Sequence, residues 1–333
     1  MREPAEPADA NAEGIYQDES DYAHFVQAEI GSEKLPLYLL VDTGAGTTWI
    51  MGSDCTSEAC KLHDTFDPSS SKSLKDTPRN FSIAYGSGHV NGHNVIDNLN
   101  LGDVEVSMEF GVAHDTSSDF EHFAFDGILG LSLNKGSTEN MPRVAKEEKK
   151  LGKNMFSVFL SRGLNAPNNG ELTLGGINDA KYSGEITYTN VAADRDGDWA
   201  IPIDSIKMDG KDAKLEKSRV AYIDTGTTYI FGPTADVKSV HDLVKGAKST
   251  DGVSWTIPCD TTLELSFTFS GKTWTVLPQD WIQPPNAKGE CQSNVYGHEV
   301  VPGAWLLGAQ FLKNVYTVFD FQGDTAKIGV FPP

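Results

Sequence analysis

Basic residues and long apolar runs are scarce in this chain of 333 residues. It has 27 lysine and arginine residues against 47 aspartate and glutamate residues, a formal net charge of -20 at pH 7. Because this excess repels phosphate backbones and anionic lipid heads, neither nucleic acid nor a membrane is expected as a partner. Apolar runs such as 37–41 are far too short to span a bilayer.

Cysteine is also scarce, with four in the chain. None forms a C-x-x-C pair, which disfavours zinc and thioredoxin-like sites. Four cysteines allow three pairings, and proximity along the chain favours Cys55–Cys60 and Cys259–Cys291. We expect two structural disulfides and an oxidising compartment, with two reduced pairs as the alternative.

The first fourteen residues lack the apolar segment of a signal peptide. They are rich in Ala, Asp, Pro and Glu, a composition that favours disorder. We therefore expect 1–14 to be a disordered acidic tail on a processed chain, and a secreted form would have lost its targeting segment.

Two motifs recur in the same order in the two halves of the chain. Asp-Thr-Gly occurs at 42–44 and again at 224–226, and each is followed further on by two apolar residues and a glycine, at 128–130 and 306–308. Such repetition predicts two related halves. We expect an N-terminal lobe over 15–188, with the first aspartate, and a C-terminal lobe over 189–333, with the second.

The local pattern is mostly β. Residues 37–41 and 220–223 are buried-strand runs that lead into the two Asp-Thr-Gly turns, and 263–269 alternates with a period of two residues. The best helix candidates are 142–151 and 234–245. The 32 glycines and 16 prolines fit many short strands and turns. The sequence therefore predicts a mostly β protein with two lobes.

The duplicated turns suggest paired-carboxylate chemistry. If a pseudo-twofold axis relates the halves, Asp42 and Asp224 can face each other across it, and Gly44 and Gly226 let the backbone approach the carboxylates closely. Two carboxylates this close cannot both ionise easily, so the pair holds one proton over a wide pH range. One member can then take a proton from water while the other donates to a carbonyl oxygen, which is the chemistry of peptide hydrolysis without a covalent intermediate.

From residue 15 to residue 333 the chain resembles the pepsin-like aspartic endopeptidases, particularly fungal secreted members. The motifs that carry this resemblance are the two Asp-Thr-Gly turns, Trp49 after the first, Thr227 and Thr228 after the second, and the segments 84–88, 125–130, 305–308 and 315–320. The resemblance implies two pseudo-twofold-related, β-barrel-like lobes with an active-site cleft between them.

The resemblance also implies roles for particular residues. Asp42 and Asp224 would be catalytic, supported by Thr43, Gly44, Thr225 and Gly226. The flap and substrate-binding residues would be Tyr85, Gly86, Ser87, Trp49, Leu40, Phe120, Ile128, Thr227 and Thr228. Tyr85 would hydrogen-bond to the indole of Trp49, and the largely apolar pocket implies a preference for large hydrophobic residues beside the scissile bond.

The implied biochemistry is that of a secreted, or otherwise vacuolar, monomeric enzyme made as a zymogen. It would act on polypeptides without a cofactor and would bind pepstatin-type inhibitors. The alternative is a catalytically silent protein of the same fold that binds peptides or glycans. Two residues depart from the family pattern: Ala45 replaces a serine and Ala309 replaces an aspartate, and both changes should raise the pKa of the carboxylate pair.

Three further motifs have simpler interpretations. His89 and His93 have a spacing used by helical metal sites, but the surrounding glycines predict a hairpin, so no metal site is expected. Residues 194–198 resemble the start of a calcium loop but lack its order and its closing glutamate, which favours a solvated acidic loop. Asn80 begins an N-glycosylation sequon, N-F-S, next to the flap.

Overall fold

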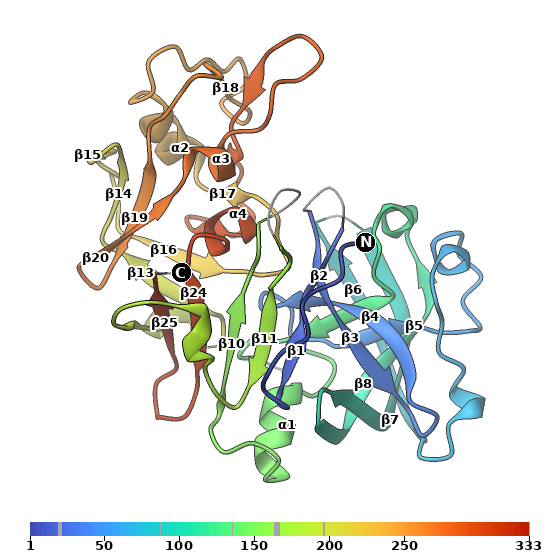
Figure 1. The fold of residues 1–333 in the computed structure, drawn as a ribbon. Helices are drawn as coiled ribbons and strands as arrows, with labels where there is room; N and C mark the ends of the chain where they lie inside the picture. The colour runs from blue at the N-terminus through green and yellow to red at the C-terminus, as the bar shows by residue number, and fades with distance from the viewer. Residues whose placement is uncertain (19–21, 87, 135, 163–166, 196, 333) are drawn as a thin grey trace. The chain divides into compact units, whose positions relative to one another are not determined.

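The computed structural model describes residues 1–18, 22–86, 88–134, 136–162, 167–195 and 197–332. The chain divides into two compact units, Met1–Asn178 (unit 1) and Asp179–Pro333 (unit 2), each described separately below. Strands dominate in both (Figure 1), which confirms the mostly β prediction. None of the helices within the described ranges has the length and apolar character that a membrane crossing requires.

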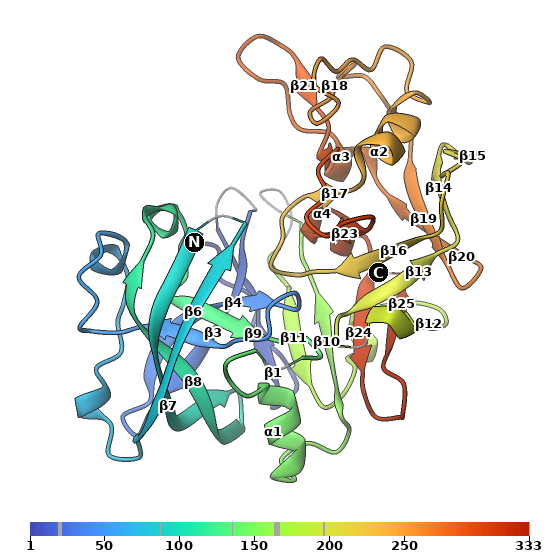
Figure 2. The same cartoon turned by 180° about the vertical axis from the view of Figure 1, so that it is seen from behind.

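Unit 1 is organised around one large, partly closed sheet. Its strands are β1 (Ala12–Gly14), β2 (Tyr16–Gln17), β3 (His24–Ile30), β4 (Leu35–Asp42), β5 (Trp49–Met51), β6 (Lys75–Tyr85), β7 (Gly88–Leu101), β8 (Val104–Thr116), β9 (Gly127–Gly130), β10 (Met155–Phe159) and β11 (Glu171–Leu174). Eight of these form a sheet in the order β2-β3-β4-β9-β5-β8-β7-β6, and an additional β3–β7 pairing closes a ring within it. Figure 2 shows the long hairpin of β6 and β7 in cyan. Closing the ring reduces the exposed sheet edges.

Short helices connect the strands of unit 1. They are η1 (Ala59–Leu62), η2 (Pro68–Ser70), η3 (Ser118–His122) and α1 (Met141–Glu147). We expected the α1 helix to continue to Leu151, which is wrong, because Lys149 adopts a positive φ of 62°. Helical backbone cannot continue through that conformation.

The amino-terminal segment differs from its prediction. Strand β1 pairs antiparallel with β11, with Ala12 opposite Thr173, and β11 pairs in turn with β10. Nearer the start, the Ala5 N–H donates to the Asn168 carbonyl at 2.8 Å. The expectation of a disordered tail over 1–14 is therefore wrong where these ladder bonds form. The polar composition of this segment led to the wrong expectation, because strand pairing uses backbone groups and does not require apolar side chains.

Unit 2 contains several smaller sheets. Its strands are β12 (Thr187–Asn190), β13 (Ala200–Ile203), β14 (Ser205–Met208), β15 (Lys211–Asp212), β16 (Arg219–Ile223), β17 (Ile230–Phe231), β18 (Thr256–Ile257), β19 (Leu265–Phe269), β20 (Lys272–Val276), β21 (Cys291–Gln292), β22 (Val295–Tyr296), β23 (Trp305–Leu307), β24 (Tyr316–Asp320) and β25 (Lys327–Phe331). Its helices are η4 (Asp179–Lys181), η5 (Ala193–Arg195), α2 (Thr234–His241), α3 (Pro278–Trp281) and α4 (Ala309–Leu312). The strand orders are β13-β16-β23-β17-β22, β15-β14-β19-β20 and β18-β21, and β25 pairs with both β24 and β12.

The sequence repeat corresponds to a repeat in topology. Unit 1 contains the order β3-β4-β9-β5-β8, and unit 2 contains β13-β16-β23-β17-β22. The directions also agree: β4–β9 and β16–β23 are parallel, whereas β5–β9 and β17–β23 are antiparallel. The second strand of each of these orders, β4 and β16, leads to an Asp-Thr-Gly turn. Two independent agreements of order and direction support the prediction of related halves.

The boundary between the units lies earlier than residue 188. Strand β12 begins at Thr187, and its Tyr188 pairs with Gly329 of β25, so this strand belongs to unit 2. The predicted α2 helix also ends earlier than expected, at His241 rather than at Lys245. The existence of this helix was predicted correctly, whereas its end depends on tertiary contacts.

Both favoured disulfides are present. Cys55 is bonded to Cys60, and Cys259 to Cys291, which confirms the local pairings. The second bond closes a longer loop beside the β18–β21 ladder, where Ile257 pairs with Cys291. Cross-links of this kind restrict the unfolded chain.

A buried histidine makes the stability of unit 2 depend on pH. The His241 ring stacks on Trp255, with centroids 4.6 Å apart. Its Nδ1 lies 2.8 Å from the Val237 carbonyl and its Nε2 lies 2.9 Å from the Ser293 hydroxyl. A carbonyl can only accept, so Nδ1 carries the proton and Nε2 accepts from Ser293 in the neutral ring. Burial lowers the pKa of His241 from 6.5 to about 4.

Replacing His241 with glutamine is expected to weaken this pH dependence. As the pH falls below 6.5, the unfolded chain takes up the proton before the folded chain does, so this group destabilises the fold progressively until pH 4. We expect the loss of unfolding free energy between pH 7 and pH 4.5 to shrink by about 2–3 kcal/mol in His241→Gln. Urea unfolding at both pH values measures it, with exposed His298→Gln as the control. An equal pH dependence in both variants would refute the assignment.

Candidate active site

The first Asp-Thr-Gly turn holds a buried carboxylate. Asp42 ends β4 and is 8% exposed. Its Oδ1 accepts the N–H groups of Gly44 and Ala45, both at 2.9 Å. Its carbonyl accepts the Leu131 N–H at 2.8 Å, just beyond the parallel neighbour strand β9. Hydrogen bonds from backbone N–H groups favour the ionised carboxylate in this buried place.

The second turn repeats this arrangement, but one of its donors is a hydroxyl. Asp224 is also 8% exposed, and its Oδ1 accepts the Gly226 N–H at 2.9 Å. Its Oδ2 accepts the Thr227 hydroxyl at 2.7 Å. The corresponding position in unit 1 is Ala45, which has no hydroxyl. The two aspartates therefore occupy equivalent turns whose donors differ in chemistry.

The remaining support residues lie in or beside these turns. Thr43 and Thr225 are almost completely buried. The Thr227 carbonyl accepts the Ala309 N–H at 2.8 Å, and the Thr228 carbonyl accepts the Gln310 N–H at 3.0 Å. Ala309 is fully buried at the start of α4. Ala309, the second departure from the family pattern, is thus hydrogen-bonded directly to the chain of the Asp224 turn.

The expected flap is the tip of the β6–β7 hairpin. Its ladder runs to Tyr85, which pairs with Gly88, while Gly86 is exposed with open space around it. Ser87 lies outside the described residues. Gly88 has φ of +110°, and a Cβ there would lie 2.5 Å from the Ser117 Oγ, so this position requires glycine.

The flap tyrosine is tied to the core of unit 1. The Trp49 indole donates to the Tyr85 hydroxyl at 2.8 Å, which is the bond that the resemblance implied. Burial raises the pKa of the Tyr85 phenol above its ordinary value, and the nearby Asp42 carboxylate raises it further, whereas the Trp49 bond opposes the shift. The phenol therefore stays neutral and can still donate its own proton.

The proposed pocket residues gather in one apolar cluster. Leu40, Ile128 and Phe120 are 7%, 3% and 2% exposed, and all belong to the cluster that contains Trp49. The Phe120 ring meets the Trp49 ring edge-on at 5.4 Å, and Tyr85 packs at the margin. The structure thus brings together every described unit 1 residue of the predicted pocket.

Sequence reasoning missed the support behind the first turn. The Thr47 hydroxyl accepts the Ser137 N–H, and the Thr48 N–H donates to the Thr138 hydroxyl, both at 2.9 Å. The Thr48 hydroxyl also accepts the Gly130 N–H at 3.1 Å. The pair of threonines after Gly46 was the available signal, but their partners are distant in sequence.

An aromatic group beside the second turn was also missed. Tyr229, Phe231 and Tyr296 are partly exposed and pack together, with Tyr229 and Tyr296 centroids 5.1 Å apart. Gln283 donates to the Tyr296 hydroxyl at 2.9 Å. Tyr229 follows Thr228 directly, so this aromatic surface adjoins the Asp224 turn.

The other motifs also have places in the fold. His89 and His93 lie on β7, a strand, and the His89 Nε2 is 3.7 Å from an Asp115 carboxylate oxygen. Of the 194–198 loop, residue 196 lies outside the described ranges. Among the residues that the structure describes, no group of three or more His, Cys, Asp or Glu side chains could hold a metal ion. Asn80 is exposed on β6.

Comparison with known proteins agrees with this geometry. The family model for eukaryotic aspartyl protease matches residues 22–331. The chain is 37% identical over 328 residues to the probable aspartic-type endopeptidase CTSD of Trichophyton verrucosum, covering 97% of this chain and 64% of that protein. It is 36% identical over 329 residues to the aspartic-type endopeptidase ctsD of Aspergillus fumigatus, covering 97% and 68%.

A vertebrate relative is also similar: cathepsin E-B of Xenopus laevis is 31% identical over 327 residues, covering 94% of this chain and 80% of that protein. The chain thus spans about two thirds of the length of the fungal relatives and more of the vertebrate one. The match to the family model extends over nearly all of the described residues. The chain therefore belongs to the eukaryotic aspartyl protease family.

Proposed function

We propose that this protein is an acid endopeptidase that hydrolyses peptide bonds with Asp42 and Asp224 acting as a pair. The observation that carries this proposal is the duplicated turn: each aspartate is nine-tenths buried, and each accepts the N–H two residues further along the chain. Burying a carboxylate is costly, and a fold that buries two of them at equivalent positions does so for a function. Relatives named as aspartic-type endopeptidases support the same activity.

The chemistry follows from two carboxylates that share a proton. The ionised member removes a proton from a water molecule, whose oxygen attacks the peptide carbonyl carbon. The protonated member gives its proton to the carbonyl oxygen, which produces a neutral tetrahedral intermediate. The member that took the water proton then gives it to the leaving nitrogen, while the other carboxylate takes a proton from a hydroxyl of the intermediate. The C–N bond breaks, the carboxyl product forms and the pair again holds one proton. No covalent enzyme intermediate is formed.

Substrate recognition is proposed to involve the flap and the apolar cluster beneath it. An extended peptide can pair its backbone with the Gly86 region, as strand addition does. Leu40, Phe120 and Ile128 would form the floor of a pocket, because little of each side chain is exposed. An apolar floor favours large hydrophobic residues beside the scissile bond.

Digestion of a denatured protein in acid tests the proposed function. We expect the chain to cleave acid-denatured haemoglobin at about pH 3.5 between bulky apolar residues, and pepstatin to abolish the cleavage. Loss of activity near pH 7 is expected as the shared proton dissociates. Binding of peptides or glycans without any cleavage would refute the proposal and identify a catalytically silent protein.

The cellular setting is part of the proposal. Two disulfides suit an oxidising compartment, so we propose secretion, with the vacuole as the alternative. We also propose a monomer made as a zymogen, with a glycan on the exposed Asn80. A shift in mass after treatment with an N-glycosidase would establish the glycan.

Restoring a hydroxyl at Ala45 should move the pH profile. The Thr227 hydroxyl donates a hydrogen bond to Asp224 at 2.7 Å. A serine at the equivalent position 45 can donate a hydrogen bond to Asp42. This bond favours the ionised carboxylate. In Ala45→Ser we therefore expect the acid limb of the kcat/KM profile to move to lower pH by about half to one pH unit. Rates measured across the acid range give the shift. Ala235→Ser, at an exposed position of helix α2, is the control, and coincident profiles for all three proteins would contradict the expectation.

A further inference from the structure

The flap hairpin has a gap in its ladder well below the tip. Strands β6 and β7 pair at Lys75–Ile96 and Asp76–Val95, and pairing resumes only at Asn80–His93. Residues 77–79 lie in the gap, and Pro78 has no N–H to contribute. From Asn80 the ladder continues to the tip. The hairpin therefore contains a point at which its upper part can pivot.

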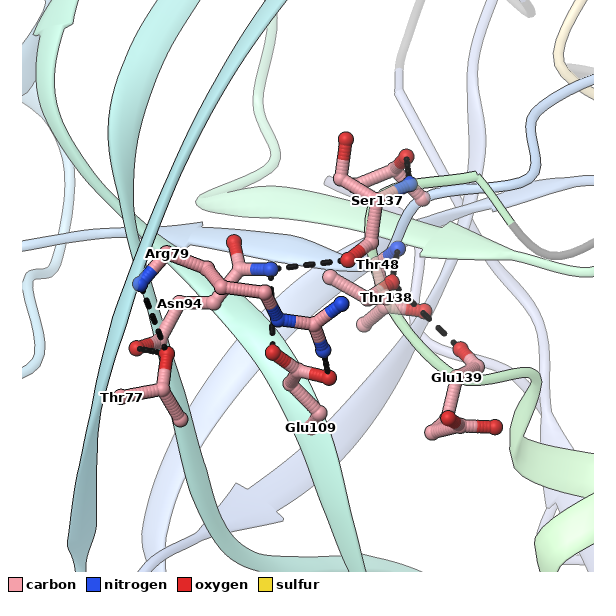
Figure 3. A network of polar contacts seen from close by, with 9 residues as sticks. Thr48, Thr77, Arg79, Asn94, Glu109, Ser137, Thr138 and Glu139 are labelled. Atoms are coloured by element: carbon pink, nitrogen blue, oxygen red, sulfur yellow. Dashed lines mark hydrogen bonds and ion pairs between the residues drawn. The ribbon is translucent and has the colours of Figure 1, made fainter.

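Side chains replace the missing ladder bonds at this gap (Figure 3). The Thr77 hydroxyl donates to the Asn94 carbonyl of β7 at 2.6 Å. The guanidinium of Arg79 forms an ion pair with the carboxylate of Glu109, which belongs to β8. Side chains of β6 thus hold the gap to β7 and, across it, to β8.

The partners of this gap are polar groups in a buried place. Glu109 is 5% exposed and Asn94 is 1% exposed, although both lie in a sheet. The Asn94 amide donates to the Glu109 Oε1 at 3.1 Å and to the Ser137 carbonyl at 2.8 Å. The Asn94 Oδ1 is buried and has no hydrogen-bond partner among the described residues. A carboxylate as buried as that of Glu109 seldom adds stability over apolar packing, so orientation is the better explanation of this cluster.

The same cluster reaches the support behind Asp42. Ser137 accepts from Asn94 through its carbonyl and donates its N–H to the Thr47 hydroxyl. Thr138 next to it accepts the Thr48 N–H. Thr47 and Thr48 continue directly from the Asp42 turn. An unbroken series of hydrogen bonds therefore joins the gap in the flap to the chain beside the first aspartate.

We propose that Arg79, Glu109 and Asn94 are positioning residues that hold the flap hinge in register with the Asp42 turn. These three residues touch no substrate. They affect substrate binding by positioning the flap backbone and Tyr85. The kinetic consequence rests on the proposed function: a flap that pivots freely should bind an extended peptide less well, while the chemical step at the aspartates should be little changed.

Hydrogen exchange and kinetics of two variants test this inference. Arg79→Gln removes the cation from a side chain that is more than half exposed, so it opens no cavity, and Glu109→Gln removes the charge but keeps an oxygen for Asn94. In each we expect amides of 81–85 and 88–93 to exchange about tenfold faster, and KM for an extended peptide to rise about tenfold with kcat within about twofold. Arg79→Lys keeps the charge, so its flap exchange rates and its KM should be close to the wild-type values.

The exposed pair Lys61–Glu58 provides the matched control in the same unit. Glu58→Gln should leave flap exchange and KM unchanged. If flap exchange stays at the wild-type rate in both Arg79→Gln and Glu109→Gln, or if kcat falls while KM does not change, the inference is wrong. Exchange is measured without substrate, so an inactive wild-type chain would refute the proposed function and still leave this inference decided by the flap amides.

Discussion

Replacing either Asp42 or Asp224 with asparagine is expected to reduce kcat by about a thousandfold or more. The amide cannot accept the proton of the attacking water, and it cannot share a proton with the remaining carboxylate. Because both members are required, the double variant should be little worse than either single one. Initial rates on a fluorogenic peptide in acid measure the effect.

Asparagine should leave the fold around each turn intact, which makes the loss interpretable. At position 42 the amide oxygen can still accept the N–H groups of Gly44 and Ala45. At position 224 the amide oxygen can accept from Gly226, and the Thr227 hydroxyl can rotate to accept from the amide nitrogen. Thermal unfolding should therefore change little.

The exposed Asp103, in the same unit as Asp42, provides the control. Asp103→Asn should retain full activity. If Asp42→Asn or Asp224→Asn retained wild-type kcat, the paired-carboxylate chemistry would be refuted, since one carboxylate alone cannot act as base and acid together.

The parts of the fold that could be predicted were those that repeat or alternate. The two Asp-Thr-Gly turns were identified because the same triplet follows a buried-strand run twice, and β4 and β16 indeed precede them. The Trp49–Tyr85 bond followed from the family resemblance. Both disulfides followed from proximity along the chain.

What could not be predicted depends on contacts between residues far apart in sequence. Along β8, Glu105 and Ser107 alternate with valines and are exposed, and the same period would place Glu109 in solvent. Glu109 is instead buried, because Asn94 of β7 and the chain near 137–139 lie against it. A local pattern carries no information about such coverage. The flap hinge was therefore absent from the sequence-based expectations.

A second large effect is expected from an ion pair buried in unit 2. Arg219 of β16 donates to both oxygens of Asp236 on α2, at 2.6 and 3.1 Å, and the two side chains are 12% and 3% exposed. The Trp305 indole of β23 donates to the same carboxylate at 3.3 Å. Strand β16 leads into the Asp224 turn, and β23 is its parallel neighbour. The pair thus joins α2 to both strands behind the second aspartate.

Arg219→Met is expected to lower the unfolding free energy by about 3–5 kcal/mol. The methionine fills most of the space but leaves the Asp236 carboxylate buried without its cation. Arg219→Met combined with Asp236→Leu should recover part of this loss, because the second change removes the stranded charge. Urea unfolding at pH 7 measures all three proteins.

The exposed pair Lys238–Asp242 at the end of the same helix is the control. It shows how much stability an ion pair contributes when it is not buried. Its side chains are 61% and 55% exposed at a distance of 2.7 Å. Solvent screens this pair, so Lys238→Met should cost less than about 1 kcal/mol. If Arg219→Met cost no more than Lys238→Met, the Asp236 carboxylate would have to be reached by water or protonated in the variant. The ion pair could then not be what secures α2 to the strands that carry Asp224.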